Sequence, residues 1–161
     1  RDFEGDSSSS KVGTDLKYLY LAMDKKYTYM RIDTYRGVPA GNTNFWYTLS
    51  LFKPFKTNIR YALEITRHED NYVAEVNKYD RNAGELFSRY RVGNTLRMSG
   101  THIEARFHNS SILDFLDQDD EDSFRYEYID IEYFNVGYDS RVRDRIRFGH
   151  TPSSIIYRKW E

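Results

Sequence analysis

The sequence predicts an all-β domain, an antiparallel β-sandwich of jelly-roll type with little helix. Apolar and polar residues alternate with a period of two along most of the chain, which is typical of half-buried strands. Roughly eight to ten such runs follow one another at intervals of about 8–12 residues, with turn-forming residues between them. Aromatic residues make up 17% of the 161 residues, and this content excludes a disordered chain despite 30% charged residues.

The first predicted elements form a hairpin. Residues 16–23 are dense in apolar side chains, as expected of a strand covered on both sides. A polar turn at residues 24–26 follows. In residues 28–34, Met30 and Ile32 point to one side of the predicted strand, and the residues between them point to the other. The two runs are therefore predicted to pair as a hairpin.

A candidate strand at residues 45–52, ending near Pro54, precedes a predicted three-stranded meander. Each strand of the meander alternates apolar and polar residues, and both corners consist of turn-forming residues. The strands of the meander are predicted at residues 59–66, 72–79 and 85–92, and its turns at residues 68–71 and 80–84.

The second half of the chain continues the same pattern. One short helical turn is expected at residues 110–116. No repeat or domain boundary is evident, so we expect a single domain over residues 15–161, preceded by a flexible polar segment at residues 1–14. The remaining strands are predicted at residues 102–108, 128–134 and 142–148.

The charge and residue composition exclude several classes of function. Lys and Arg number 24 against 25 Asp and Glu, and this balance argues against a general nucleic-acid binder. No apolar run approaches the roughly 20 residues of a membrane helix, so no membrane insertion is expected. The chain has no Cys, which excludes thiol catalysis and Cys-based metal sites. Nucleophile-elbow, phosphate-loop and dinucleotide motifs are also absent from the sequence.

A candidate ligand-binding platform comes from the residues that alternate with the predicted core. If the side of its strand that carries Trp46 faces outward, Trp46 and Tyr29 present rings on which a sugar can stack. Arg31, Asp33 and Arg60 are then candidates to bind the hydroxyl groups of the sugar. The alternative is that Trp46 belongs to the core and that the tyrosines border the sheets.

The acidic stretch at residues 114–122 is a candidate calcium site. Asp117, Asp119 and Glu121 have the odd-position spacing of a calcium loop, in which several oxygens bind the ion. Asp122 stands where an EF-hand has its glycine, so the stretch is not an EF-hand. The alternative is a solvated acidic loop without a metal.

Four arginines alternate near the C-terminus and are predicted to share one face of a strand. One interpretation is a groove for acidic sugars such as uronates, because guanidinium groups match carboxylates. The other is pairing across the sheet with the acidic residues of the preceding strand. The arginines are Arg141, Arg143, Arg145 and Arg147, and the acidic partners are Glu127, Asp130 and Glu132.

Two stretches resemble the superfamily that contains family 9 carbohydrate-binding modules and DOMON-like domains. Residues 15–33 resemble its first hairpin, in which an apolar strand ends in Ala-x-Asp before a short turn. Residues 100–113 resemble its Glu-containing strand and the segment that follows it. The resemblance implies a β-sandwich and, as in the sugar-binding members, non-catalytic binding through aromatic side chains. Other members of the group carry haem.

Together these observations predict a non-catalytic carbohydrate-binding module of a secreted or cell-surface protein. Its expected partner is a polysaccharide or glycan, and it is expected to tether a neighbouring domain of a larger chain to that glycan. Three alternatives remain. They are a structural or adhesion domain that binds another protein, a small carbohydrate-active enzyme (a glycosidase or lyase), and a haem carrier.

Overall fold

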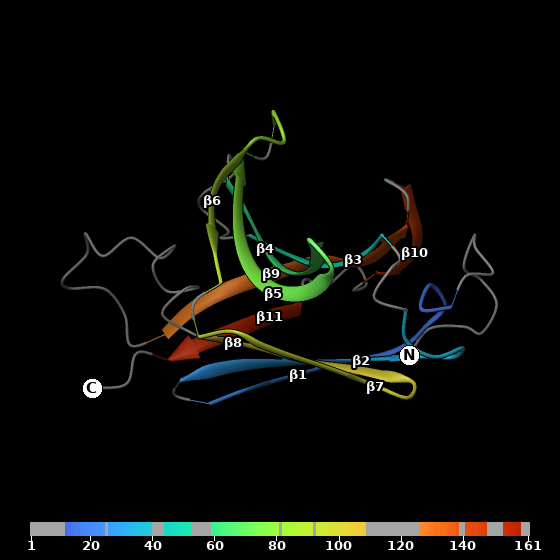
Figure 1. The fold of residues 1–161 in the computed structure, drawn as a ribbon. Coiled ribbons are helices and arrows are strands. Elements are labelled where there is room, and N and C mark those ends of the chain that lie inside the picture. Colours follow the sequence, from blue (N-terminus) through green and yellow to red (C-terminus); the bar gives the residue numbers. More distant parts are fainter. Residues whose placement is uncertain are drawn as a thin grey trace.

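The computed structural model confirms the all-β prediction. It describes residues 12–24, 26–39, 44–52, 59–80, 82–91, 93–108, 126–138, 141–147 and 153–158. These residues form eleven strands in two antiparallel sheets that pack face to face as a β-sandwich (Figure 1). No helix long and apolar enough to cross a membrane occurs in this part of the chain.

The smaller sheet has four strands in the order β1-β2-β8-β7. The β1–β2 hairpin forms as predicted, with Ala22 opposite Tyr29 and Leu21 opposite Met30. At the turn, the Asp24 carboxylate accepts hydrogen bonds from the backbone N–H groups of Lys26 and Tyr27. The strand bounds are Leu16–Met23 for β1, Tyr27–Thr34 for β2, Thr95–Ser99 for β7 and His102–His108 for β8.

The larger sheet has seven strands, six of them in the order β10-β9-β3-β4-β5-β6. The predicted meander is its β4-β5-β6 portion; β4 and β5 pair without a shift from His68 opposite Asn71 onward, and the register of β5 against β6 shifts between Lys78 and Tyr79. The seventh strand, β11, pairs with the first half of β9, while β10 pairs with the second half. The strand bounds are Phe45–Phe52 (β3), Ile59–His68 (β4), Asn71–Asp80 (β5), Leu86–Tyr90 (β6), Tyr126–Tyr138 (β9), Arg141–Arg147 (β10) and Ser153–Arg158 (β11).

The hydrophobic core fills the space between the two sheets. The small sheet contributes Met30, Ile32 and Phe107, which are almost fully buried. The large sheet contributes alternate residues of its central strands, so the period of two places one complete face of each sheet inside. These residues are Tyr47, Leu49, Leu51, Tyr61, Leu63, Ile65, Val76, Phe134 and Val136.

The large sheet is strongly curved, and this curvature shapes its outer face. β5 bends sharply, and β6 and β10 rise at opposite ends of the sheet, while β3, β4 and β9 lie between them (Figure 1). The inner face packs on the small sheet, whereas the outer face is concave.

Strand β1 corrects one expectation. Residues 16–23 were expected to be covered on both sides, yet β1 is an edge strand of the small sheet with an open outer face. Leu19 and Leu21 pack against the core, while Tyr20 is 49% exposed. The apolar density misleads here because a tyrosine can face water through its hydroxyl.

Two strands were not predicted, and one predicted element lies outside the described residues. β7 has only Leu96 and Met98 as apolar members, which is too short a pattern to predict a strand. In β11 the two isoleucines are adjacent, so apolar and polar residues do not alternate there. The helical turn expected at residues 110–116 falls in a part of the chain that the structure does not describe.

The end of the N-terminal segment is anchored in the core. Thr14 and Asp15 are buried, and the Tyr47 hydroxyl donates a hydrogen bond of 2.7 Å to the Gly13 carbonyl. Gly13 has a φ of +86°, and a Cβ there would lie 2.7 Å from the Pro39 ring, so only glycine fits this position. The rest of the predicted flexible segment, residues 1–11, is not among the described residues.

Candidate functional site

The outer side of the large sheet contains a hollow of about 520 Å³. Its lining side chains come from five strands and combine aromatic, guanidinium and hydroxyl groups. They include Trp46, Thr48, Arg60, Glu64, Tyr79, Tyr133, Asn135, Val142 and Arg145. We call the surface made by these residues the concave face.

Trp46 lies at one end of the concave face and is seated on Gly137. The two residues are direct partners in the β3–β9 ladder. A Cβ on Gly137 would lie 1.9 Å from Cε2 and 2.0 Å from Cζ2 of the Trp46 ring, so the indole occupies the space that a side chain at 137 would fill. The indole is only partly exposed, and it borders the hollow. The missing side chain at Gly137 thus positions the ring on the sheet surface.

A row of polar residues forms the floor of the concave face. Strand register places these residues side by side on one face across five strands, since direct partners point to the same side of a sheet. Thr48, Glu64 and Asn135 are buried although they lie on the outer side. The row runs Arg145, Asn135, Thr48, Glu64 and Glu75 from β10 to β5.

The floor holds two carboxylates as direct cross-strand neighbours. Glu64 is 7% exposed and Glu75 is 1% exposed. Like charges placed opposite each other destabilise a sheet, and burial adds a desolvation cost. Such an arrangement persists only when other groups compensate for it, and clusters of this kind concentrate at functional sites.

Asn77 bridges the two carboxylates. Its Nδ2 group donates one hydrogen bond to Glu64 Oε2 and another, of 3.0 Å, to Glu75 Oε1. A carboxylate only accepts hydrogen bonds, so the amide nitrogen must face the pair. Glu64 also accepts hydrogen bonds from Thr48 (3.1 Å) and from the Tyr79 hydroxyl (2.8 Å). Asn77 is fully buried, and its Oδ1 atom has no hydrogen-bond partner among the described residues.

The environment of Glu75 keeps this carboxylate ionised. Burial by itself raises the pKa of Glu75, but hydrogen bonds from Asn77 and Arg91 and the charge of Arg89 outweigh burial and lower it. The Arg91 Nε atom lies 2.8 Å from Glu75 Oε2. The Arg89 Nε atom lies 3.4 Å from Glu75 Oε1. Glu75 is therefore the anion of a buried ion-pair cluster.

The Tyr79 hydroxyl belongs to the same network and donates a hydrogen bond to Glu64. Burial, the charge of Glu64 and the hydrogen bond to Glu64 together raise the pKa of Tyr79 well above its ordinary value. The phenol therefore stays protonated at physiological pH.

Two arginines and two tyrosines lie over this floor. The Arg60 guanidinium is 4.5 Å from the centre of the Tyr79 ring, and its Nη1 donates a 2.9 Å hydrogen bond to the Tyr133 hydroxyl. The Arg145 guanidinium lies 4.9 Å from the Tyr133 ring centre and donates a 2.6 Å hydrogen bond to Asn135. Tyr133 is thus held between two guanidinium groups, which orients its ring.

The structure separates the predicted platform into two parts. Trp46 and Arg60 both line the concave face, as the sequence suggested. Tyr29, Arg31 and Asp33 instead lie on β2, on the outer face of the small sheet and on the opposite side of the sandwich. A period of two identifies which residues share a face of a strand, but not which sheet the strand joins. The five residues therefore do not form one platform.

Arg141, Arg143 and Arg145, the C-terminal arginines whose side chains the structure describes, do not form a regular row. A β-bulge between Val142 and Asp144 shifts the register of β10 against β9. Val142 and Arg145 consequently line the hollow, while the Nε atom of Arg143 hydrogen-bonds to the Tyr138 carbonyl. Asp144 is buried and accepts a hydrogen bond from the Leu16 backbone N–H. A bulge has no signal in this alternating sequence, so the shift was not predicted.

Sequence reasoning missed the residues that build the floor. Glu64 alternates with the apolar residues of its strand, but neither its burial nor its pairing with Glu75 was expected. The signal that was present is the polar pair Glu75 and Asn77 on one face of β5, which lie opposite Glu64 and Ala62 of β4 respectively. Nothing in the sequence around Gly137 indicated its role, because that role is to leave space for the Trp46 ring on the neighbouring strand.

The candidate calcium ligands Asp117, Asp119 and Glu121 lie outside the described residues. Within the part of the chain that the structure describes, no three His, Asp or Glu side chains gather in a way that could hold a metal ion.

No family model, curated protein or solved structure matches this chain.

Proposed function

We propose that this chain is a carbohydrate-binding β-sandwich domain that takes up a glycan on its concave face. The observation that best supports this is the position of the Trp46 indole, which packs over Gly137 at the border of a hollow of about 520 Å³. Arg60 and Arg145 line the same hollow. A sugar ring has an apolar C–H face that packs on an indole and hydroxyl groups that pair with guanidinium donors.

The arrangement of the floor supports affinity through preorganisation. Tyr133 is fixed by Arg60 and by Arg145, and Glu64 accepts hydrogen bonds from three side chains. A ligand that meets side chains already held in place loses less free energy to ordering them. The buried network thus acts as a rigid base for the exposed groups above it.

The same network favours binding over hydrolysis. A glycosidase uses a pair of carboxyl groups, one of which acts as a general acid with a raised pKa. Glu75 has a lowered pKa, is 1% exposed and pairs with two arginines. This is the environment of a structural anion rather than of a proton donor.

The proposal agrees with the resemblance of residues 15–33 and 100–113 to family 9 carbohydrate-binding modules and DOMON-like domains. In that setting the domain is part of a secreted or cell-surface protein. A single weak site of this kind gains avidity when it is linked to further modules.

Affinity gel electrophoresis tests the proposal. Xylan, glucomannan and mixed-linkage β-glucan are cast separately into native gels, and the mobility of the protein is compared with that in a gel without polysaccharide. We expect at least one polysaccharide to retard the wild-type chain, and Trp46→Ala to abolish the retardation. Phe87→Ala removes an exposed ring that does not line the hollow and is the matched control, so it should migrate as the wild type does.

Circular dichroism establishes that both variants keep the all-β fold. Retardation of none of the three polysaccharide gels would refute the proposal, as would equal retardation of the wild type and W46A.

A further inference from the structure

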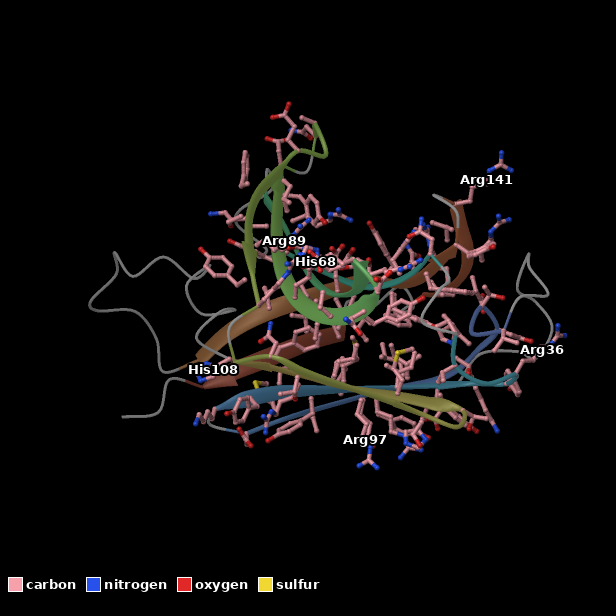
Figure 2. The ribbon with its side chains drawn as sticks, in the orientation of Figure 1. Arg36, His68, Arg89, Arg97, His108 and Arg141 are labelled. Atoms are coloured by element: carbon pink, nitrogen blue, oxygen red, sulfur yellow. The ribbon has the colours of Figure 1, made fainter. Side chains whose placement is uncertain are left out.

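The small sheet has a second hollow, of about 490 Å³, on its outer side. Strand register arranges its side chains in two rows across the four strands. Tyr20, Arg31, Glu104 and Arg97 form one row, and Ala22, Tyr29, Arg106 and Thr95 form the next. Figure 2 shows Arg97 projecting from this side of the molecule, far from Arg141 on the large sheet.

Two of the three guanidinium groups on this face make no direct ion pair among the described residues. Arg31 pairs with Asp33 at 2.7 Å. In the described part of the chain, no carboxylate lies within 4.0 Å of the guanidinium of Arg97 or of Arg106, although Glu104 is the cross-strand neighbour of Arg97. The Nε atom of Arg106 is buried and has no hydrogen-bond partner among the same residues. Asp24 acts on Arg106 only through its charge, and Glu104 is only the cross-strand neighbour of Arg97. No carboxylate of the described residues therefore binds the guanidinium donors of these two arginines directly.

Aromatic rings flank these charges and fix their orientation. The Arg106 guanidinium lies 4.2 Å from the centre of the Tyr27 ring, and the Arg31 guanidinium lies 5.8 Å from that of Tyr20. A guanidinium stacked on a ring directs its N–H groups sideways, where an anionic oxygen can accept them.

Two of the rings also offer surface to a ligand. Tyr20 is 49% exposed and Tyr29 is 37% exposed. The Tyr29 hydroxyl donates a 2.7 Å hydrogen bond to Asp24, so its ring is held in place beside Arg106. Exposed phenol rings next to guanidinium groups without a direct ion pair match a ligand that has both a flat apolar face and a negative charge.

We propose that this hollow is a second binding site and that it takes an acidic polysaccharide. The carboxylate or sulfate groups of the polysaccharide bind Arg97 and Arg106, and its sugar rings pack on Tyr20 and Tyr29. This site is separate from the concave face, because the two hollows lie on the outer sides of different sheets. One domain can then bind two polysaccharide chains at once.

The test is the affinity of the wild-type chain for heparin, which is sulfated, and for polygalacturonate, which is carboxylated. We expect at least one of them to bind, with an affinity that falls as salt rises. If only one binds, the result identifies the anionic group that the site recognises. Polyglutamate serves as an acidic chain without sugar rings and should bind at least about tenfold more weakly.

Two substitutions that each remove one positive charge locate the site. Arg97→Gln should weaken binding at least about tenfold, because a charge-assisted hydrogen bond is lost. Arg141→Gln removes an exposed arginine from the large sheet and should leave the affinity within about twofold. Tyr20→Ala should weaken binding of the polysaccharide but not of polyglutamate.

Several results would overturn this inference. They are failure of both acidic polysaccharides to bind, equally tight binding of polyglutamate, and equal losses in R97Q and R141Q. Trp46→Ala should retain heparin or polygalacturonate binding, so failure of the concave-face proposal and failure of this one give different results.

Discussion

Gly137 lies directly beneath the indole of Trp46, and a methyl group there would come within 1.9 Å of a ring carbon. The two residues face each other across the β3–β9 ladder. The position of the only tryptophan on the concave face, within the described residues, therefore depends on the absence of a side chain one strand away.

Gly137→Ala tests this dependence. The added methyl group must displace the indole, and overpacking of this kind costs about 1–3 kcal/mol of unfolding free energy. Urea unfolding of both chains measures the loss. In a Trp46→Ala background the same substitution should cost almost nothing, because no ring remains to be displaced. Equal costs in both backgrounds would show that the indole does not rest on Gly137.

Glu75→Gln removes the anion of the buried cluster. Arg89 and Arg91 lose their ionic partner, and because both guanidinium groups are partly exposed we expect a loss of about 1–2 kcal/mol at pH 7. Glu85 is exposed, so Glu85→Gln is the matched control and should change stability by less than about 0.5 kcal/mol.

The loss in E75Q should depend on pH in a defined direction. Because the pKa of Glu75 is lower in the folded than in the unfolded chain, its ionised form contributes stability above the unfolded pKa of about 4.3. That contribution disappears as pH falls through the folded pKa. The stability difference between wild type and E75Q should therefore shrink in acid, and a difference that is constant from pH 7 to pH 3 would contradict the assignment.

Asn77→Asp places a third carboxylate between Glu64 and Glu75. The amide donors are lost and a buried like charge is added, so we expect a loss of roughly 3 kcal/mol or more at pH 7. Burial and the two neighbours raise the folded pKa of the new carboxyl, so its penalty should grow as pH rises and fade in acid. Thermal unfolding between pH 4 and pH 7 measures this. Asn71→Asp, at an exposed position, should show no such trend.

Tyr47→Phe removes the hydroxyl that holds the Gly13 carbonyl. Tyr47 is fully buried, so the carbonyl loses its donor in a site from which water is excluded, at a cost of about 1–2 kcal/mol. Tyr29→Phe removes a hydroxyl whose hydrogen bond to Asp24 is exposed, and should cost less than half as much. Chemical denaturation of the two variants side by side would reveal any reversal of this order.

Much of the fold could be predicted because alternation is strong where one face of a strand is buried. β2 places Met30 and Ile32 inside, and β4 places Tyr61, Leu63 and Ile65 inside, as their sequences indicate. β7 escaped prediction because two apolar residues in five give too short a pattern. β1 misled because tyrosines on its outer face resemble core residues in sequence.

The candidate site was predicted only in part, for a physical reason. Trp46 and Arg60 alternate with the apolar residues of their strands, which left open whether Trp46 faces outward or belongs to the core. Sheet membership is a long-range property, and it placed Tyr29 on the other side of the sandwich. Glu64 and Glu75 are contacted by long side chains such as Tyr79 and Arg91. The residues next to Glu64 and Glu75 in the sequence do not indicate these contacts.

The most direct test of glycan binding on the concave face is the indole N–H signal of Trp46 in an NMR titration. With ¹⁵N-labelled tryptophan, the Trp160→Phe variant assigns this signal, since the chain has two tryptophans. Oligosaccharide fragments of xylan, glucomannan and mixed-linkage β-glucan are titrated in turn. We predict a saturable shift of the Trp46 signal with at least one of them, lost in Arg60→Ala. A Trp46 signal that stays unmoved by all three would contradict the account.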